Sequence, residues 1–184
     1  MKKGAITMKT AVVYYSETGN TAKVATAIHA ALGGDAILSP LQDEPSLDGA
    51  DLVFVGMPII KFGAPEPAQM FLKEQCAGRR VALFLTHTAP DNLDELASWI
   101  DACKQAAAGS EVVGLFHCQG ELAEPIKQWM LQSGQLMLVQ FAELSGCADG
   151  QPDETALARA ADFARETVAS EEFELAAARG VAVF

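Results

Sequence analysis

Residues 9–34 read KTAVVYYSETGNTAKVATAIHAALGG, and this stretch predicts a strand, a polar loop and a helix in direct succession. The apolar run at residues 9–15 is rich in β-forming side chains and ends at a loop with hydroxyl groups and a glycine. From residue 21, apolar side chains recur at the spacing of one buried helical face, and two glycines end the helix. The apolar positions are Val24, Ala25, Ile28 and Leu32.

The same succession of strand and helix recurs along the chain. Further strands are predicted at residues 36–38, 51–56, 80–86 and 111–118. Helices are predicted at residues 66–76, 91–107 and 154–168, with Asp153 as the N-cap of the last. Strands that alternate with helices form parallel sheets through right-handed connections. We therefore predict an α/β fold, a doubly wound five-stranded parallel sheet with helices on both faces.

Residues 121–152 fit this alternation less well. They contain a predicted amphipathic helix at residues 125–137 and an apolar segment at 136–144 that could be strand or helix. No repeat or linker separates a second domain, so we predict a single domain over residues 9–170 and a C-terminal extension over 171–184.

Composition restricts the classes of function and partner. The 184 residues carry a net charge of −11, and 50% of them are apolar. This balance predicts a folded domain that repels nucleic acid and anionic lipid and favours a partner with a basic face. No apolar run is long enough to predict a membrane span.

The C-terminal extension ends with two large apolar side chains. Val181 and Phe184 could pack on the domain or in a homodimer.

The cysteines and the first residues bear on the cellular compartment. Four cysteines lie far apart with no Cys-x-x-Cys pair, which argues against zinc ribbons and iron–sulfur clusters and predicts free, mostly buried thiols. They are Cys76, Cys103, Cys118 and Cys147. Residues 1–8 lack the continuous apolar stretch of a signal peptide, so we predict a cytoplasmic location.

The first loop carries the residues that indicate chemistry. It presents three hydroxyl groups, a glycine and an asparagine directly ahead of a helix. Free backbone N–H groups at a helix N-terminus bind anions, and hydroxyls add hydrogen bonds without a basic side chain. The loop has neither the Walker pattern nor Gly-x-Gly-x-x-Gly, so triphosphate and dinucleotide sites are disfavoured.

Tyr15-Ser-Glu-Thr-Gly-Asn-Thr21 resembles the [Ser/Thr]-x-Thr-Gly-x-Thr signature of flavodoxins, and the order of elements is similar from about residue 9 to residue 170. The resemblance implies that this loop holds the 5′-phosphate of FMN. The implied contacts are Ser16, Glu17, Thr18, Gly19, Asn20 and Thr21. The alternative is a helix cap rich in serine and threonine that binds no ligand.

By the same resemblance, the loop after the third strand wraps the isoalloxazine ring. The implied contacts are Pro58, Ile59, Ile60, Lys61, Phe62 and Gly63. Ile60 or Phe62 would face the ring, although Phe62 could instead pack in the core or meet a partner. Gly63 is the predicted site of a peptide that reorients with redox state, because glycine tolerates both signs of φ. Lys61 is either a positive charge near the flavin or a solvated surface side chain.

The loops after the fourth and fifth strands complete the implied site with Thr86, His87, Thr88 and Gln119. No tyrosine follows Tyr15, although electron-carrying flavodoxins stack a tyrosine on the outer ring face. His87 either takes that place or caps the next helix.

Cys118 opens a Cys-Gln-Gly ending that resembles some proteins of the flavodoxin-like family, and it is either a buried thiol or a nucleophile. We predict no set of catalytic residues in the chain itself. We also predict no set of metal ligands.

The resemblance implies an FMN-binding electron-transfer protein that shuttles electrons between a reductase or ferredoxin and a redox enzyme. An alternative is an FMN-dependent oxidoreductase that takes hydride from NAD(P)H and reduces a quinone or another small substrate, with residues 121–152 as a substrate lid. A flavin-free interaction module on the same fold is a further alternative, because a fold does not determine a function.

Overall fold

The structure is a computed structural model that describes residues 8–178, so Val181 and Phe184 lie outside the described part of the chain. Its sheet has the strand order β2-β1-β3-β4-β5, and every neighbouring pair is parallel. The strands are β1 (Thr10–Tyr14), β2 (Ile37–Pro40), β3 (Leu52–Pro58), β4 (Arg80–His87) and β5 (Glu111–Gln119). This is the five-stranded parallel sheet that the sequence predicts.

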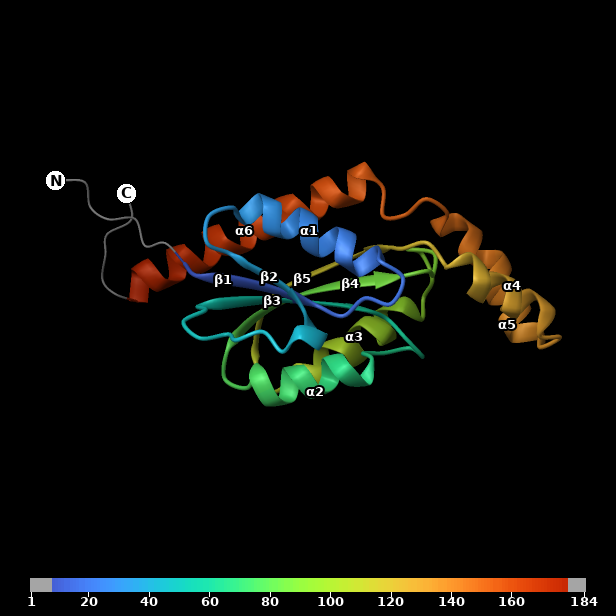
Figure 1. Cartoon of the computed structure of the whole chain (residues 1–184), viewed down its shortest axis with the longest axis horizontal. Helices are drawn as coiled ribbons and strands as arrows, with labels where there is room; N and C mark the ends of the chain where they lie inside the picture. The colour runs from blue at the N-terminus through green and yellow to red at the C-terminus, as the bar shows by residue number, and fades with distance from the viewer. Residues whose placement is uncertain (1–7, 179–184) are drawn as a thin grey trace.

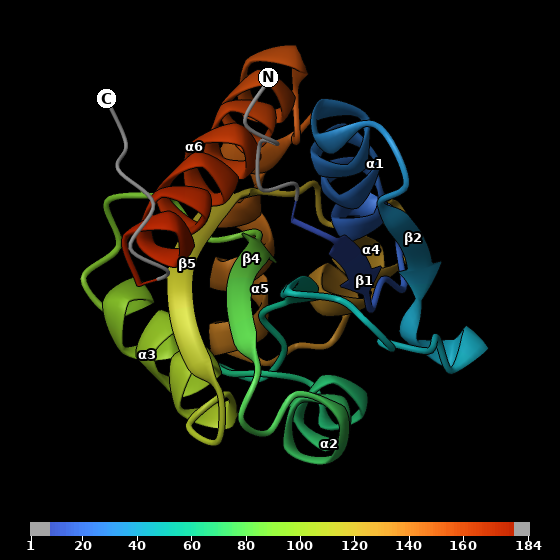
Figure 2. The ribbon, with the colours of Figure 1, turned by 90° about the vertical axis from the view of Figure 1, so that its left-hand side faces the viewer.

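Helices cover both faces of the sheet (Figure 1). One face carries α1 (Asn20–Leu32) and α6 (Glu154–Ala178), and the other carries α2 (Glu66–Gln75) and α3 (Leu96–Ala106). The short α4 (Glu124–Gln132) and α5 (Leu136–Leu144) lie beyond one end of the strands, behind the sheet in Figure 2. Two single turns, η1 (Leu41–Asp43) and η2 (Ser145–Ala148), complete the described elements.

The apolar strands read as continuous runs because both of their faces are buried. Successive side chains of β1 enter different cores: Val12 packs with α1 and α6, whereas Val13 packs with α2 and α3. Phe54 and Val55 divide in the same way on β3. The doubly wound architecture follows from this alternation, and the predicted fold class is confirmed.

Two helices differ from their predicted bounds. The helix predicted at residues 91–107 begins only at Leu96, because residues 91–95 form turns after β4. The helix predicted to end at residue 168 continues to Ala178. Its added turns carry Glu171, which is only 4% exposed and pairs with Arg80 at the start of β4. Charged residues that resemble a surface tail in the sequence are therefore fixed to the sheet.

The segment over residues 121–152 resolves into helices. The apolar piece whose type was open is the helix α5, and Gly134, with a φ of 67°, lies in the turn that separates it from α4. Asp153 is the predicted cap of α6, and its Oδ1 accepts the amide of Ala156 at 2.8 Å. Among residues 8–178, no helix combines the length and the apolar character that crossing a bilayer requires.

Candidate functional site

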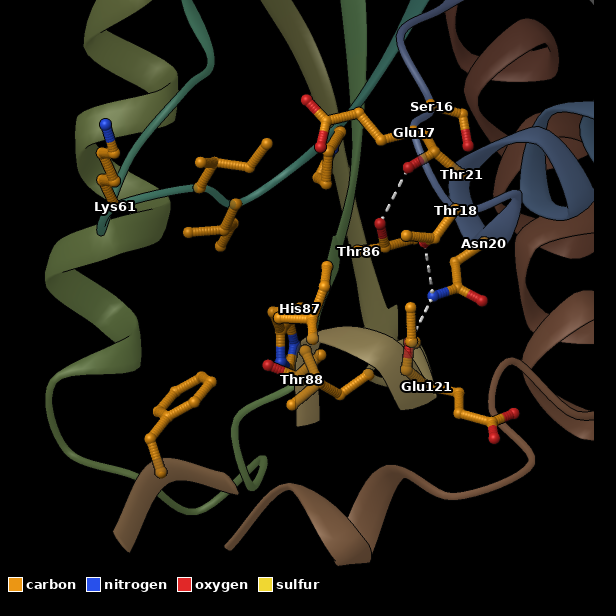
Figure 3. Close-up of a pocket in the computed structure, with 18 of the residues that line it drawn as sticks. Ser16, Glu17, Thr18, Asn20, Thr21, Lys61, Thr86, His87, Thr88 and Glu121 are labelled. Atoms are coloured by element: carbon orange, nitrogen blue, oxygen red, sulfur yellow. Dashed lines mark hydrogen bonds between the residues drawn. The ribbon is translucent and has the colours of Figure 1, made fainter. Parts of the chain in front are cut away.

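The site lies at the carboxyl ends of the strands, where the sheet order reverses around β1. Ligands of doubly wound sheets bind at this switch point, because loops on its two sides diverge. A cavity of about 310 Å³ opens there (Figure 3). Most of the predicted contacts line it: Ser16, Glu17, Thr18, Asn20, Thr21, Pro58, Ile59, Ile60, Lys61, Thr86, His87 and Thr88. These residues come from three separate segments of the chain, which the sheet brings together at this cavity.

Loop 16–21 holds its own shape through Ser16. The Oγ of Ser16 accepts the amides of Gly19 at 3.1 Å and Ala22 at 3.3 Å, which fixes the loop against the start of α1. Gly19 has a φ of 93°, a left-handed conformation that favours glycine. Ser16 thus acts first as a structural acceptor.

Five backbone N–H groups remain free in this loop. Within residues 8–178, no acceptor is found for the amides of Ser16, Glu17, Thr18, Asn20 and Thr21. They lie at the N-terminus of a helix of 13 residues, where the helix dipole adds partial positive charge. This arrangement suits an anion such as a phosphate.

Two side chains of the loop have other partners than a ligand. The Oγ1 of Thr21 lies 2.8 Å from the Oγ1 of Thr86, and both residues are buried. Asn20 donates through Nδ2 to the carbonyl of Glu121 at 2.8 Å, which ties the loop to the chain after β5. A Cβ at Gly120 would lie 2.9 Å from the Cβ of Asn20, so the close approach of the backbone at residue 120 to the Asn20 side chain requires glycine. Figure 3 shows both hydrogen bonds.

Loop 58–63 forms a tight turn with two left-handed residues. The amide of Ile60 donates to the carbonyl of Gly63 at 2.9 Å, and the amide of Gly63 donates back to the carbonyl of Ile60 at 3.2 Å. Lys61 and Phe62, with φ of 50° and 69°, are the left-handed residues, because a turn of this kind needs positive φ at its two central residues. Gly63 does not have positive φ here, and the reorientation of its peptide with redox state stays a prediction.

The aromatic residue of this loop lies outside the main cavity. Phe62 is 58% exposed and packs on Trp99 of α3 with ring centroids 4.9 Å apart. Both rings line a small neighbouring cavity together with Phe141 of α5. Ile60 lines the main cavity and is the residue of the predicted pair that can face a ligand there.

A further wall comes from α4, α5 and the chain before them, within the segment 121–152 that the oxidoreductase alternative places over the site, although the sequence analysis named none of its side chains. These lining residues are Gly120, Glu121, Leu122, Ala123, Ile126, Met130 and Phe141. The amphipathic pattern at residues 125–137 was the available signal, but it does not say where the helix packs. The cavity therefore has a polar end at loop 16–21 and apolar walls from loop 58–63 and from α4 and α5.

Gln119 lies outside the predicted site, whereas His87 lines the cavity and does not cap the next helix. Gln119 does not line the main cavity, because its Nε2 donates to the carbonyl of Ala89 at 3.1 Å and to Cys147 Sγ at 3.2 Å. The His87 ring is 1% exposed and does not cap α3, whose N-cap is Glu95. Burial, followed by repulsion from His117, lowers the pKa of His87.

Cys118 is a buried thiol, as predicted in one of the two alternatives. All four cysteines are free, and only Cys147 is exposed. Burial raises the pKa of Cys76, Cys103 and Cys118 to about 12, so these thiols stay protonated near neutral pH. A thiolate is the reactive form, so none of these three is a nucleophile in the folded chain.

This burial predicts the outcome of thiol titration. A thiol-specific reagent such as dithionitrobenzoate is expected to label one cysteine in the native protein and four after unfolding. Cys147→Ser is the control and should remove the single native reaction. Rapid labelling of Cys118 in the folded protein would contradict the burial described here.

Comparison with known proteins agrees with the fold. The chain is 30% identical over 125 residues to the flavodoxin-like domain-containing protein BilS of Clostridioides difficile (strain CD3), covering 65% of this chain and 70% of BilS. A flavodoxin from the domain Archaea superposes with a TM-score of 0.54 at 17% identity, over 89% of this chain and 98% of that one. Oxidised flavodoxin 2 of Bacillus cereus gives 0.53 at 17% identity, over 89% and 99%.

A sequence model covers most of the described residues. The model of the flavodoxin domain matches residues 11–165, from the first strand into the last helix. The match includes loop 16–21 and all five strands of the sheet. The chain therefore belongs to the flavodoxin domain family.

Proposed function

We propose that the chain binds FMN in the cavity at the switch point and transfers electrons between redox proteins. The observation that carries this proposal is the group of free amides at the start of α1, at the polar end of a cavity whose other walls are apolar. A volume of about 310 Å³ fits within the range of roughly 300–1,000 Å³ that small-molecule sites occupy.

The phosphate of FMN would bind at loop 16–21. The amides of Glu17, Thr18, Asn20 and Thr21 would donate to its oxygens, together with the hydroxyl of Thr18. No lysine or arginine is needed at this position, because the helix dipole and the amides supply the positive potential. Gly19 allows the backbone to approach the ligand closely.

The isoalloxazine ring would lie between loop 58–63 and the wall from α4 and α5. Ile59 and Ile60 would contact one side, and Met130 and Phe141 offer apolar surface on the other. Thr86 and Thr88 would lie near the polar edge of the ring. When bound, FMN would supply one-electron and two-electron redox chemistry.

The charge of the chain supports a carrier that docks transiently. Glu17 and Glu121 line the cavity and are exposed at its mouth, and the whole chain has a net charge of −11. Acidic groups around a redox site accelerate encounter with a basic partner at low ionic strength. We therefore expect the partner reductase, ferredoxin or redox enzyme to present a basic face.

The test is flavin binding by the purified chain. We expect yellow protein, or colourless protein that takes up FMN and quenches its fluorescence. Riboflavin lacks the phosphate and should bind at least about 100-fold more weakly, because the loss of even two charge-assisted hydrogen bonds of roughly 1.5 kcal/mol each has this effect. Thr18→Ala removes the one hydroxyl assigned to the phosphate and should weaken FMN binding, whereas Thr26→Ala on the same helix should bind FMN like the wild type. Colourless protein that FMN cannot reconstitute would refute the proposal.

The position of α4 and α5 favours a second candidate, an NAD(P)H oxidoreductase. Ile126, Met130 and Phe141 line the cavity from these helices, so they could enclose a small substrate above the ring. Mixing the flavin-loaded chain with NADH or NADPH separates the two functions. Catalytic oxidation of the nucleotide would favour the enzyme, whereas reduction only through a partner reductase would favour the carrier.

A further inference from the structure

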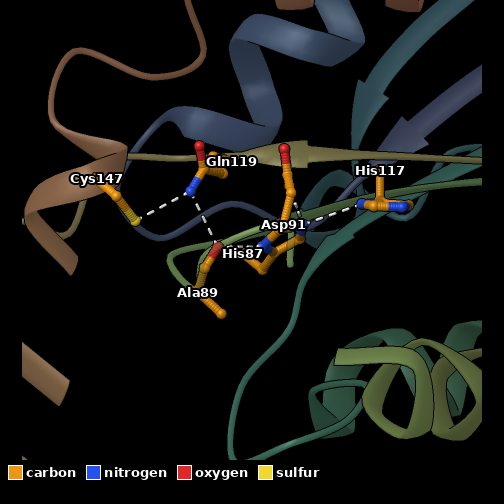
Figure 4. Close-up of polar contacts among 6 residues, drawn as sticks. All are labelled: His87, Ala89, Asp91, His117, Gln119 and Cys147. Atoms are coloured by element: carbon orange, nitrogen blue, oxygen red, sulfur yellow. Dashed lines mark hydrogen bonds and ion pairs between the residues drawn. The ribbon is translucent and has the colours of Figure 1, made fainter. Parts of the chain in front are cut away.

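Two histidines and an aspartate converge at the ends of β4 and β5, beside the cavity (Figure 4). The Nε2 of His87 lies 3.1 Å from the Nδ1 of His117 and 3.7 Å from an Oδ1 of Asp91. All three atoms lie within 4.8 Å of one another. His87 ends β4, Asp91 follows it in the loop, and His117 comes from the paired strand β5, so the sheet itself brings them together.

The hydrogen bonds of His87 determine which of its nitrogens is available. Its Nδ1 lies 3.1 Å from the carbonyl of Ala89, an atom that can only accept a hydrogen bond. Nδ1 therefore carries the hydrogen, and Nε2 keeps a lone pair directed toward His117 and Asp91. A backbone carbonyl that holds one imidazole nitrogen while the other binds a metal is a common arrangement in metalloproteins.

The spacing of the three atoms is close to that of a tetrahedral zinc site. With Zn–N bonds of about 2.05 Å, two ligands of a tetrahedral ion lie about 3.3 Å apart. The separations of 3.1 and 3.7 Å from His87 differ from this value by a few tenths of an ångström, and the exposed Asp91 side chain would close the third separation, from His117, which is within 4.8 Å. We propose that His87, Asp91 and His117 bind a divalent transition-metal ion of the zinc class, with water as the fourth ligand.

The surroundings of this triad, His87, Asp91 and His117, suit such an ion. The His87 side chain is 1% exposed and the Asp91 side chain is 61% exposed, so one side of the site is enclosed and the other meets solvent. To bind the ion through Nδ1, His117 would carry its hydrogen on Nε2 instead of Nδ1. The imidazole would change its tautomer but would release no proton.

A bound ion would link the loop after β4 to β5. That loop also carries Thr88, which lines the cavity with Thr86 and His87. The metal would therefore brace one wall of the cavity. Its binding does not depend on the flavin, so the proposal stands or falls separately from the proposed function.

The test is titration of the chelator-treated full chain with Zn²⁺ by calorimetry, followed by thermal unfolding. We expect one equivalent to bind and the unfolding temperature to rise. Asp91→Asn and His117→Gln should each weaken Zn²⁺ binding at least about 10-fold and lose the rise in temperature. Asp91 is exposed, so its variant should fold even if the substitution of His117 disturbs β5.

Two controls separate the triad from other ligands in the chain. His29 is the third histidine, and its Nε2 lies 2.9 Å from the carbonyl of Ala36, so His29→Gln should bind Zn²⁺ like the wild type. Cys147→Ser should also keep the affinity. The proposal is overturned if the wild type binds no equivalent of Zn²⁺, if Asp91→Asn binds as tightly as His29→Gln, or if Cys147→Ser abolishes binding.

Discussion

Gly56→Ala is expected to lower the free energy of unfolding by about 3 kcal/mol. Gly56 lies in the middle of β3 and pairs with Phe84 of β4, whose ring covers the glycine. A Cβ at residue 56 would lie 2.0 Å from Cε2 of Phe84, and this ring is fully buried. Because the sheet backbone on both sides of the pair is fixed, the ring or the strand must shift. Urea denaturation of the two proteins measures the difference.

Gly109→Ala is the matched control for this prediction. Its new Cβ would come no closer than 3.9 Å to Ala77, so we expect a change within about 0.5 kcal/mol. A second variant separates steric clash from other effects: Phe84→Leu combined with Gly56→Ala should be less destabilised than the sum of the single changes. Alanine has the better strand propensity, so a stabilising effect of Gly56→Ala alone would contradict the predicted clash.

The strands were predictable because a strand that is buried on both faces has apolar side chains at consecutive positions. β1, β3 and β4 are covered on both faces, so each appears as an apolar run, and the parallel sheet follows from its alternation with helices. The end of α6 was not predictable in this way. Its last turns are rich in helix-forming residues, but they also pack Ala176 on the core and pair Glu171 and Glu174 with Arg80, contacts that join residues 91 and 94 positions apart in the sequence for the two ion pairs.

The candidate site could also be predicted only where the sequence acts locally. Loop 16–21 could be predicted, because its glycine, its hydroxyls and its place before a helix act locally. Phe62 and Gln119 were assigned to the cavity from their loops, yet side-chain direction depends on neighbours that are distant in sequence. Phe62 turns toward Trp99, and Gln119 turns toward Ala89 and Cys147.

The contact between the two histidines was not predictable from the sequence for the same reason. The prediction for His87 concerned only the flavin and the next helix, and no prediction was made for His117. The pairing of Leu85 with His117 in the sheet places the two imidazoles in contact, and this register is not visible in either segment alone. The prediction of no metal ligands rested on the spacing of the cysteines, which does not bear on this pair.

Thr18→Asp is expected to weaken FMN binding by about 100-fold, because the introduced carboxylate would repel the phosphate of FMN. Two unit charges about 5 Å apart repel by about 3 kcal/mol at an effective dielectric constant of about 20. Thr18 is exposed and lines the polar end of the cavity, where the phosphate would bind. Its only side-chain hydrogen bond within the described residues is a long one of 3.4 Å from Asn20, so stability should change by less than about 0.5 kcal/mol. Fluorescence titration with FMN measures the loss.

Thr26→Asp is the control for charge. Thr26 is exposed on the same helix, so the variant carries the same added charge, but it lies more than one turn beyond the loop. Its affinity for FMN should stay within about twofold of the wild type at physiological ionic strength, because solvent and salt screen the added charge. Added salt should recover part of the affinity of Thr18→Asp for the same reason. Equal FMN affinity in Thr18→Asp and wild type would show that the phosphate binds elsewhere, even if the protein is yellow.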